Sequence, residues 1–167
     1  EDLQSLDNWK EYLKTTYNQK LENLKYCDLY KNSALRAAIQ VNSNLKNDLH
    51  PVLVPSRMTP VYRMSTRVKL PFGMCDDYTE IATAVFRSNG IPVFSDFTPQ
   101  WPFRSMGHTW NVLLNNNGKN LSFGGADTNP GDPHKLDEHM AKAFRRTYAA
   151  NSELEELQAT EKYIPST

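Results

Sequence analysis

Apolar residues recur at helical spacing near the start of the chain, whereas its middle contains short extended runs. From Leu6 to about Tyr26, and again from about Ser33 into "NSNLKNDLH", apolar residues return every three or four positions with charged residues between them. This spacing predicts two N-terminal helices. The stretch His50–Leu70 contains three prolines, so we expect irregular structure with short extended pieces there.

A third helical pattern begins at Cys75. Its apolar stripe consists of Tyr78, Ile81, Ala82, Val85 and Phe86. The pattern ends at Asn89-Gly90, and glycine suits the left-handed position that follows a helix. We therefore expect a helix of about four turns with Cys75 at its N-terminal edge.

The segments after this helix alternate between strands and turns. "IPVFSDF" predicts a strand, and "TPQWPFRSMG" predicts a loop rich in proline and aromatic residues. "HTWNVLL" and "KNLSF", joined by "NNNG", predict a hairpin. The ranges Pro133–Tyr148 and Ser152–Tyr163 read as mostly helical. Together these elements predict an α+β domain, with helices packed on an antiparallel sheet.

Composition narrows the classes of function. The 167 residues carry a formal net charge of zero, which argues against a nucleic-acid partner or an anionic membrane surface. No apolar run approaches the roughly 20 residues that a membrane-spanning helix needs. The first residue is Glu1 and not Met, so we expect that processing or trimming has removed an N-terminal segment.

Cys75 is the candidate nucleophile. The chain contains only Cys27 and Cys75, too few for a disulfide framework, although a single bridge between them is an alternative that would silence the thiol. A helix N-terminus favours the thiolate by only about 0.3–1 kcal/mol. Asp76 and Asp77 oppose this by a similar amount. A cationic imidazole must therefore supply most of the activation.

Counting along the hairpin selects His108 and Asp127 as partners. With a two-residue turn at Asn117-Gly118, His108 lies opposite Asp127; with a four-residue loop, Asp127 is the diagonal neighbour of the residue opposite. Both registers place the two side chains on one face, whereas a three-residue loop would separate them. A carboxylate beside an imidazole fixes its orientation, so Asp127 is the expected third member of a triad, with Asp132 as the fallback.

Four blocks occur in order and carry a family resemblance: Gly73-Met74-Cys75, then "RSNGIP" from Arg87 to Pro92, then His108-Thr109-Trp110, then Asp127. They resemble the G-x-C, R-x-x-G-I-P, H-x-W and D pattern of the transglutaminase-like superfamily. Bacterial exported members, in which a "DF-P-W" block precedes the histidine, are similar to "DFTPQW" here. The resemblance implies a papain-like fold and an extracytoplasmic location, in the periplasm or at the cell surface.

The chain also departs from that family. Animal calcium-dependent transglutaminases usually have a tryptophan directly after the cysteine, where this chain has Asp76, so the resemblance does not imply protein cross-linking. No upstream glutamine is identifiable as an oxyanion-hole side chain. The backbone N–H of Cys75 is one expected donor, and a second is not apparent from the sequence.

We therefore expect cysteine-dependent acyl transfer on peptide or protein amides. Cys75 attacks the carbonyl, His108 moves the proton and Asp127 orients His108. Hydrolysis is favoured over transfer to an amine because nothing in the sequence identifies an amine site. Trp101 and Phe103 are the expected substrate contacts. The alternative is a catalytically weak or inactive module of the same fold that binds peptide or glycan through these aromatic residues.

No cofactor or metal is expected. His134 and His139 lie five residues apart, which on a helix separates their directions by about 140° and makes a poor zinc pair. We expect residues 1–167 to form a single transglutaminase-like domain, with a helical N-terminal part at about 1–50 and a catalytic core at 71–130. The final "EKYIPST" indicates a fragment of a longer chain. The sequence leaves the oligomeric state open.

Overall fold

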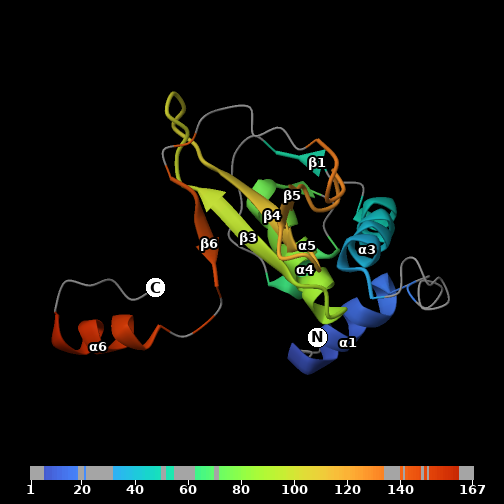
Figure 1. Ribbon diagram of the computed structural model, residues 1–167, viewed down its shortest axis with the longest axis horizontal. Helices are drawn as coiled ribbons and strands as arrows, with labels where there is room; N and C mark the ends of the chain where they lie inside the picture. Colours follow the sequence, from blue (N-terminus) through green and yellow to red (C-terminus); the bar gives the residue numbers. More distant parts are fainter. Residues whose placement is uncertain are drawn as a thin grey trace.

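An antiparallel sheet with the strand order β5-β4-β3-β6 forms the centre of the described part of the chain (Figure 1). The computed structural model describes residues 6–18, 21, 32–49, 52–54, 63–69, 72–133, 140, 142–147, 149 and 151–161. Its helices are α1 (Leu6–Tyr17), α3 (Ala34–Leu49), α4 (Met64–Arg67), α5 (Cys75–Ser88) and α6 (Ser152–Thr160). Its strands are β1 (Val52–Leu53), β2 (Phe72–Gly73), β3 (Val93–Thr98), β4 (His108–Leu114), β5 (Asn120–Phe123) and β6 (Phe144–Arg146). The α+β prediction is therefore confirmed.

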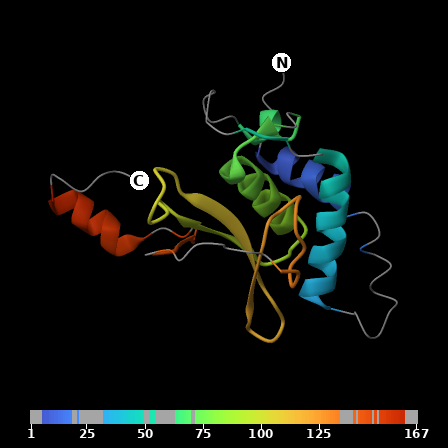
Figure 2. The ribbon, with the colours of Figure 1, turned by 90° about the horizontal axis from the view of Figure 1, so that it is seen from above.

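Helix α5 lies between the sheet and the helices α1 and α3 (Figure 2). Phe86 of α5 meets Phe123 of β5 edge to face, with 5.4 Å between the ring centroids. The core cluster around this pair consists of Leu13, Tyr17, Ala38, Val41, Leu45, Leu49, Tyr78, Ile81, Ala82, Val85, Phe86, Ile91, Val93, Leu113, Phe123 and Ala126. The burial of one apolar stripe on each of the three helices, in one shared core, is what the 3.6-residue spacing predicted.

The ends of α5 follow from local chemistry. The carboxylate of Asp77 accepts a hydrogen bond from the backbone N–H of Met74 at 3.0 Å, which fastens the first turn. Gly73 is required beneath it, because a Cβ there would lie 2.8 Å from the Cβ of Asp77. At the other end Gly90 has φ +75°, so the glycine stops the helix as predicted.

The N-terminal helices match the sequence pattern in part. Helix α3 spans Ala34–Leu49, as predicted, whereas α1 ends at Tyr17, well before the expected end at Tyr26. Residues 19–20 and 22–31 lie outside the described residues. The proline-rich stretch contains β1 as a short extended piece, and also the short helix α4, which the pattern did not predict.

The helix predicted over Pro133–Tyr148 is wrong where the structure describes it, because Phe144–Arg146 forms β6. Residues 134–139 lie outside the described residues. Strand β6 pairs with β3 through its backbone, and its side chains contact both β3 and α5. Arg145 donates to both oxygens of Asp96 at 2.7 and 2.9 Å, Arg146 pairs with Glu80, and Phe144 stacks on Phe97. These distant partners decide the conformation, and a local pattern does not contain them.

Helix α6 stands apart from the rest of the described chain, beyond β6 (Figures 1 and 2). The side chain of Asn151 caps it by accepting the N–H of Leu154 at 3.1 Å, and its residues are exposed or half-exposed. The sequence pattern predicted this helix. Among the described helices, none has the length and apolar character needed to cross a membrane.

We expect Phe123→Ala to lower the free energy of unfolding by about 3–5 kcal/mol, because it removes a fully buried ring that packs on Phe86. Urea unfolding followed by circular dichroism measures this change. Phe103→Ala is the matched control: Phe103 is 94% exposed, so its loss should change stability by less than about 0.5 kcal/mol. Similar losses in both variants would contradict this description of the core.

Candidate active site

Cys75 is the first residue of α5, and its half-buried thiol is free. The alternative of a bridge to Cys27 is therefore not present at Cys75, and Cys27 itself lies outside the described residues. Burial raises the pKa of the thiol above its ordinary value, and the Asp76 carboxylate raises it further. Backbone N–H groups of Thr109, Asp76 and Cys75 donate toward the sulfur and oppose this rise. Left to these groups, the thiol stays protonated at neutral pH.

The thiol lies beside the first residues of β4, on the edge of that strand where β5 no longer pairs with it. Residues of an antiparallel strand point their N–H and C=O groups alternately to the two neighbouring strands. Asn111 pairs with Phe123, the last residue of β5, so Thr109, two residues earlier, points the same way past the end of β5. Its C=O accepts from the Thr79 hydroxyl at 3.2 Å, and its N–H faces Cys75. Beyond the end of β5, residues of the first turns of α5 therefore contact the backbone groups of β4 that β5 does not pair.

His108 begins β4, directly before Thr109, and pairs with Thr98 of β3. Its ring stacks between two indoles, 6.0 Å from Trp101 and 5.9 Å from Trp110 between centroids. Strand alternation places His108 and Trp110 on the sheet face opposite Asn111, whose side chain bonds to α5. The structure therefore brings the thiol to the residue next to His108, at the strand edge, while the imidazole is packed on the other face.

The predicted pairing of His108 with Asp127 through the hairpin is wrong. Leu114 pairs with Asn120, and the N–H of Asn115 donates to the C=O of Lys119 at 2.9 Å. This is the three-residue register, which does not place His108 and Asp127 on one face. A distant contact accompanies this register: the side chain of Asn116 accepts from Ala34 N–H at 2.7 Å and donates to Asn32 C=O at 2.8 Å.

Asp127 lies in a turn beyond the paired part of β5. Its N–H donates to the C=O of Gly124 at 3.0 Å, and the residue is exposed. Strand pairing therefore does not set its position relative to His108. The fallback residue, Asp132, is also exposed and accepts from the N–H of Asn129 at 3.2 Å, so it caps its own turn.

Trp101 and Phe103 have different environments although the sequence places them together. Trp101 is only 8% exposed and packs on the His108 ring, so it shields the imidazole and does not form an open groove wall. Phe103 projects at the tip of the same loop. The loop is closed below it, because Trp101 N–H donates to Met106 C=O at 3.1 Å. Of the two expected substrate contacts, Phe103 is the accessible one.

Two buried asparagines near the site were missed by the sequence reasoning. Asn42 and Asn111 are both fully buried. Each occupies a position that its pattern assigns to the interior: Asn42 on the apolar stripe of α3, and Asn111 two residues before the core residue Leu113. A polar residue at such a position is a signal, because a buried amide needs hydrogen-bonding partners.

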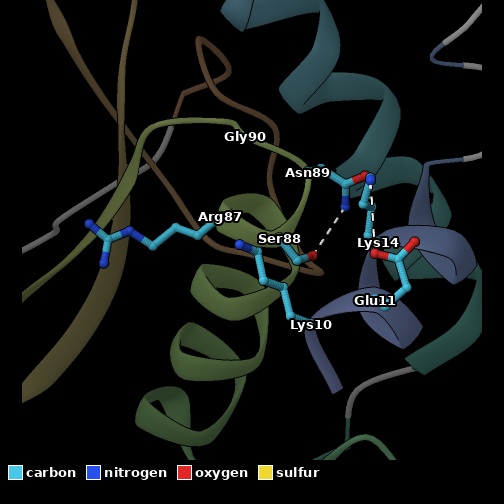
Figure 3. Close-up of a pocket in the computed structure, with 7 residues that line it drawn as sticks. All are labelled: Lys10, Glu11, Lys14, Arg87, Ser88, Asn89 and Gly90. Atoms are coloured by element: carbon cyan, nitrogen blue, oxygen red, sulfur yellow. Dashed lines mark hydrogen bonds and ion pairs between the residues drawn. The ribbon is translucent and has the colours of Figure 1, made fainter. Parts of the chain in front are cut away.

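A shallow depression lies at the opposite end of α5 (Figure 3). It is lined by Lys10, Glu11, Lys14, Arg87, Ser88, Asn89 and Gly90. Helix α5 has 14 residues and is therefore about 20 Å long, so this depression is separate from Cys75. The Arg87 side chain points away from the others in Figure 3, and its guanidinium lies over the Phe94 ring at 5.8 Å.

Among the described residues, no cluster of three or more His, Cys, Asp or Glu side chains is arranged to hold a metal.

No family model, curated protein or solved structure matches this chain. The family resemblance therefore depends on the four sequence blocks alone, and any function must be argued from the arrangement around Cys75.

Proposed function

We propose that this protein catalyses cysteine-dependent acyl transfer on peptide or protein amides, with water as the favoured acceptor. The observation that carries the proposal is the contact between the Cys75 thiol, at the start of α5, and the backbone N–H of Thr109, the residue after His108. A sulfur at a helix start, supplied with N–H donors and next in space to a histidine-bearing strand, has the components of a nucleophile site. The four sequence blocks add the expectation of a papain-like fold.

The proposed reaction begins with the neutral thiol. In this scheme the His108 ring, at the first residue of β4, turns to the strand edge and takes the proton from Cys75. The thiolate adds to the amide carbonyl, and the collapsing intermediate expels the amine, which receives that proton from His108. The product is a thioester on Cys75. Water then attacks the thioester carbonyl and gives a proton to His108. The Cys75 thiolate leaves as the carboxylic acid is released, and His108 returns the proton to it. Because burial raises the pKa of Cys75, this scheme depends on the imidazole for activation.

Asp127 has the role of orienting His108 in this proposal. That assignment depends on the order of the sequence blocks, since the hairpin register does not bring the two side chains together. An extracytoplasmic location, at the periplasm or cell surface of a bacterium, is likewise proposed from the resemblance.

A second candidate is a weakly active or inactive module that binds peptide or glycan. Two observations favour it: the exposed ring of Phe103 next to the site, and the place of Asp127 outside the ladder that carries His108.

We expect Cys75 to react with iodoacetamide rapidly at pH 6 if His108 activates it. In His108→Ala the pKa of the thiol stays above its ordinary value, because burial dominates, so almost none of the thiol is ionised at pH 6. The rate at pH 6 should therefore fall by about two orders of magnitude. Mass spectrometry of the peptide that contains Cys75 measures the rate separately from Cys27, with Cys75→Ala as the blank. A wild-type midpoint at or above the ordinary thiol value would sink the proposed pair.

The Asp127→Asn substitution tests the third role. If Asp127 orients His108, alkylation of Cys75 at pH 6 should slow by about 10- to 100-fold, while the rate at pH 9.5 should stay close to wild type. Asp132→Asn is the matched control, since both carboxylates are exposed in the same segment. A pH 6 rate in Asp127→Asn equal to that of the wild-type protein would remove Asp127 from the site.

A peptide library separates the two candidate functions. We expect the wild-type protein to cleave a subset of peptides, with new amino termini detected by mass spectrometry and without incorporation of an added primary amine. Cys75→Ala should bind the same peptides and cleave none. Binding with equal affinity by both proteins, and cleavage by neither, would favour the binding module.

A further inference from the structure

We infer that Asn111 is the positioning residue of the proposed site: one buried amide joins the helix that carries Cys75, the strand that carries His108 and the turn that carries Asp127. The inference rests on the proposed function and adds a residue that no sequence block contains. Asn111 lies on β4, three residues after His108, and is fully buried.

Every polar atom of the Asn111 side chain has a partner. Its Nδ2 donates to the Thr79 C=O at 3.1 Å and to the Thr83 hydroxyl at 2.9 Å, both on α5. Its Oδ1 accepts from the N–H of Gly125 at 3.0 Å, at the start of the turn that contains Asp127. Three segments therefore meet on a single side chain, and none of these bonds can be replaced by water in a fully buried position.

The bonds to α5 set the position of the thiol along β4. Thr79 lies one turn after Cys75, its C=O is held by Asn111, and its hydroxyl donates to Thr109 C=O at 3.2 Å. The N–H of that same Thr109 faces the Cys75 sulfur. A slide of α5 along the strand would break these contacts together. Catalysis is sensitive to such slides, since a misplacement of about 1 Å can cost 100-fold in rate.

The turn that contains Asp127 has an unfavourable backbone conformation that surrounding hydrogen bonds maintain. A Cβ on Gly125 would lie 2.1 Å from the Cβ of Ala82 and 2.6 Å from Oδ1 of Asn111, so this glycine allows the close approach. The next residue, Ala126, has φ +63°, a left-handed conformation that is unfavourable for alanine. Asn42 of α3 accepts from the Ala126 N–H at 2.8 Å and donates to the Thr128 C=O at 2.9 Å. Backbone strain that is maintained by surrounding bonds is typical of functional segments.

The test is Asn111→Leu, which keeps the approximate volume and removes all three bonds. One readout is alkylation of Cys75 by iodoacetamide at pH 6 and at pH 9.5. The other is hydrogen exchange of the Thr109 amide, measured by NMR relative to the core amide of Leu113. We expect the pH 6 rate to fall by at least about tenfold, the pH 9.5 rate to change by less than about threefold, and the protection of Thr109 to fall by about tenfold.

Two further variants keep this test decisive. Val41→Ala removes buried volume from α3 without touching the bonds of Asn111, so it should lower stability and leave both readouts unchanged. If Asn111→Leu does not fold, Thr79→Val replaces it, because valine has the shape of threonine and lacks only the hydroxyl that bonds to Thr109. It should change both readouts in the same direction, by about threefold.

The outcomes separate this inference from the proposed function. Unchanged Thr109 protection, or lost protection with an unchanged alkylation rate, overturns the positioning role of Asn111. An ordinary thiol profile in the wild-type protein overturns the proposed function instead. In that case Thr109 exchange alone decides whether Asn111 positions the thiol.

Discussion

The described structure depends on how α5 docks against the edge of β4. Where β5 ends, the first turns of α5 bond to β4 in its place. The Thr79 hydroxyl donates to the Thr109 carbonyl, and the Asn111 amide donates to the Thr79 carbonyl. Further along, the same helix buries Phe86 against Phe123. Polar bonds thus fix the docking near Cys75, where apolar burial is less complete, and the apolar core fixes it at the other end.

Local sequence was sufficient for the elements with strong spacing and clear ends. Helix α5 has its apolar stripe, Asp77 at its start and Gly90 at its end, all within about 18 residues, so no distant contact was needed to predict it. The register of the hairpin was different. Asn116 bonds to the start of α3, more than 80 residues earlier, and this contact accompanies the three-residue loop. Strand β6 likewise depends on Asp96 and Glu80.

The site divides in the same way. A cysteine at a helix start could be predicted because a glycine, a cap and a periodic stripe are adjacent in sequence. The contact between the Thr109 N–H and the sulfur could not be predicted, because it depends on where β5 ends relative to α5. The roles of Asn42 and Asn111 were open to inference only as polar residues at interior positions; their partners come from segments that the fold alone brings together.

The constrained backbone of the loop before His108 affects how any molecule would bind to that loop. Its base is closed by the Trp101–Met106 bond, and Gly107 leaves no room for a side chain against the carbonyls of Thr98 and Pro99. The backbone of so constrained a segment has little conformational entropy left to lose. A ligand that covered Phe103 would therefore gain contact area without first ordering the backbone of the loop.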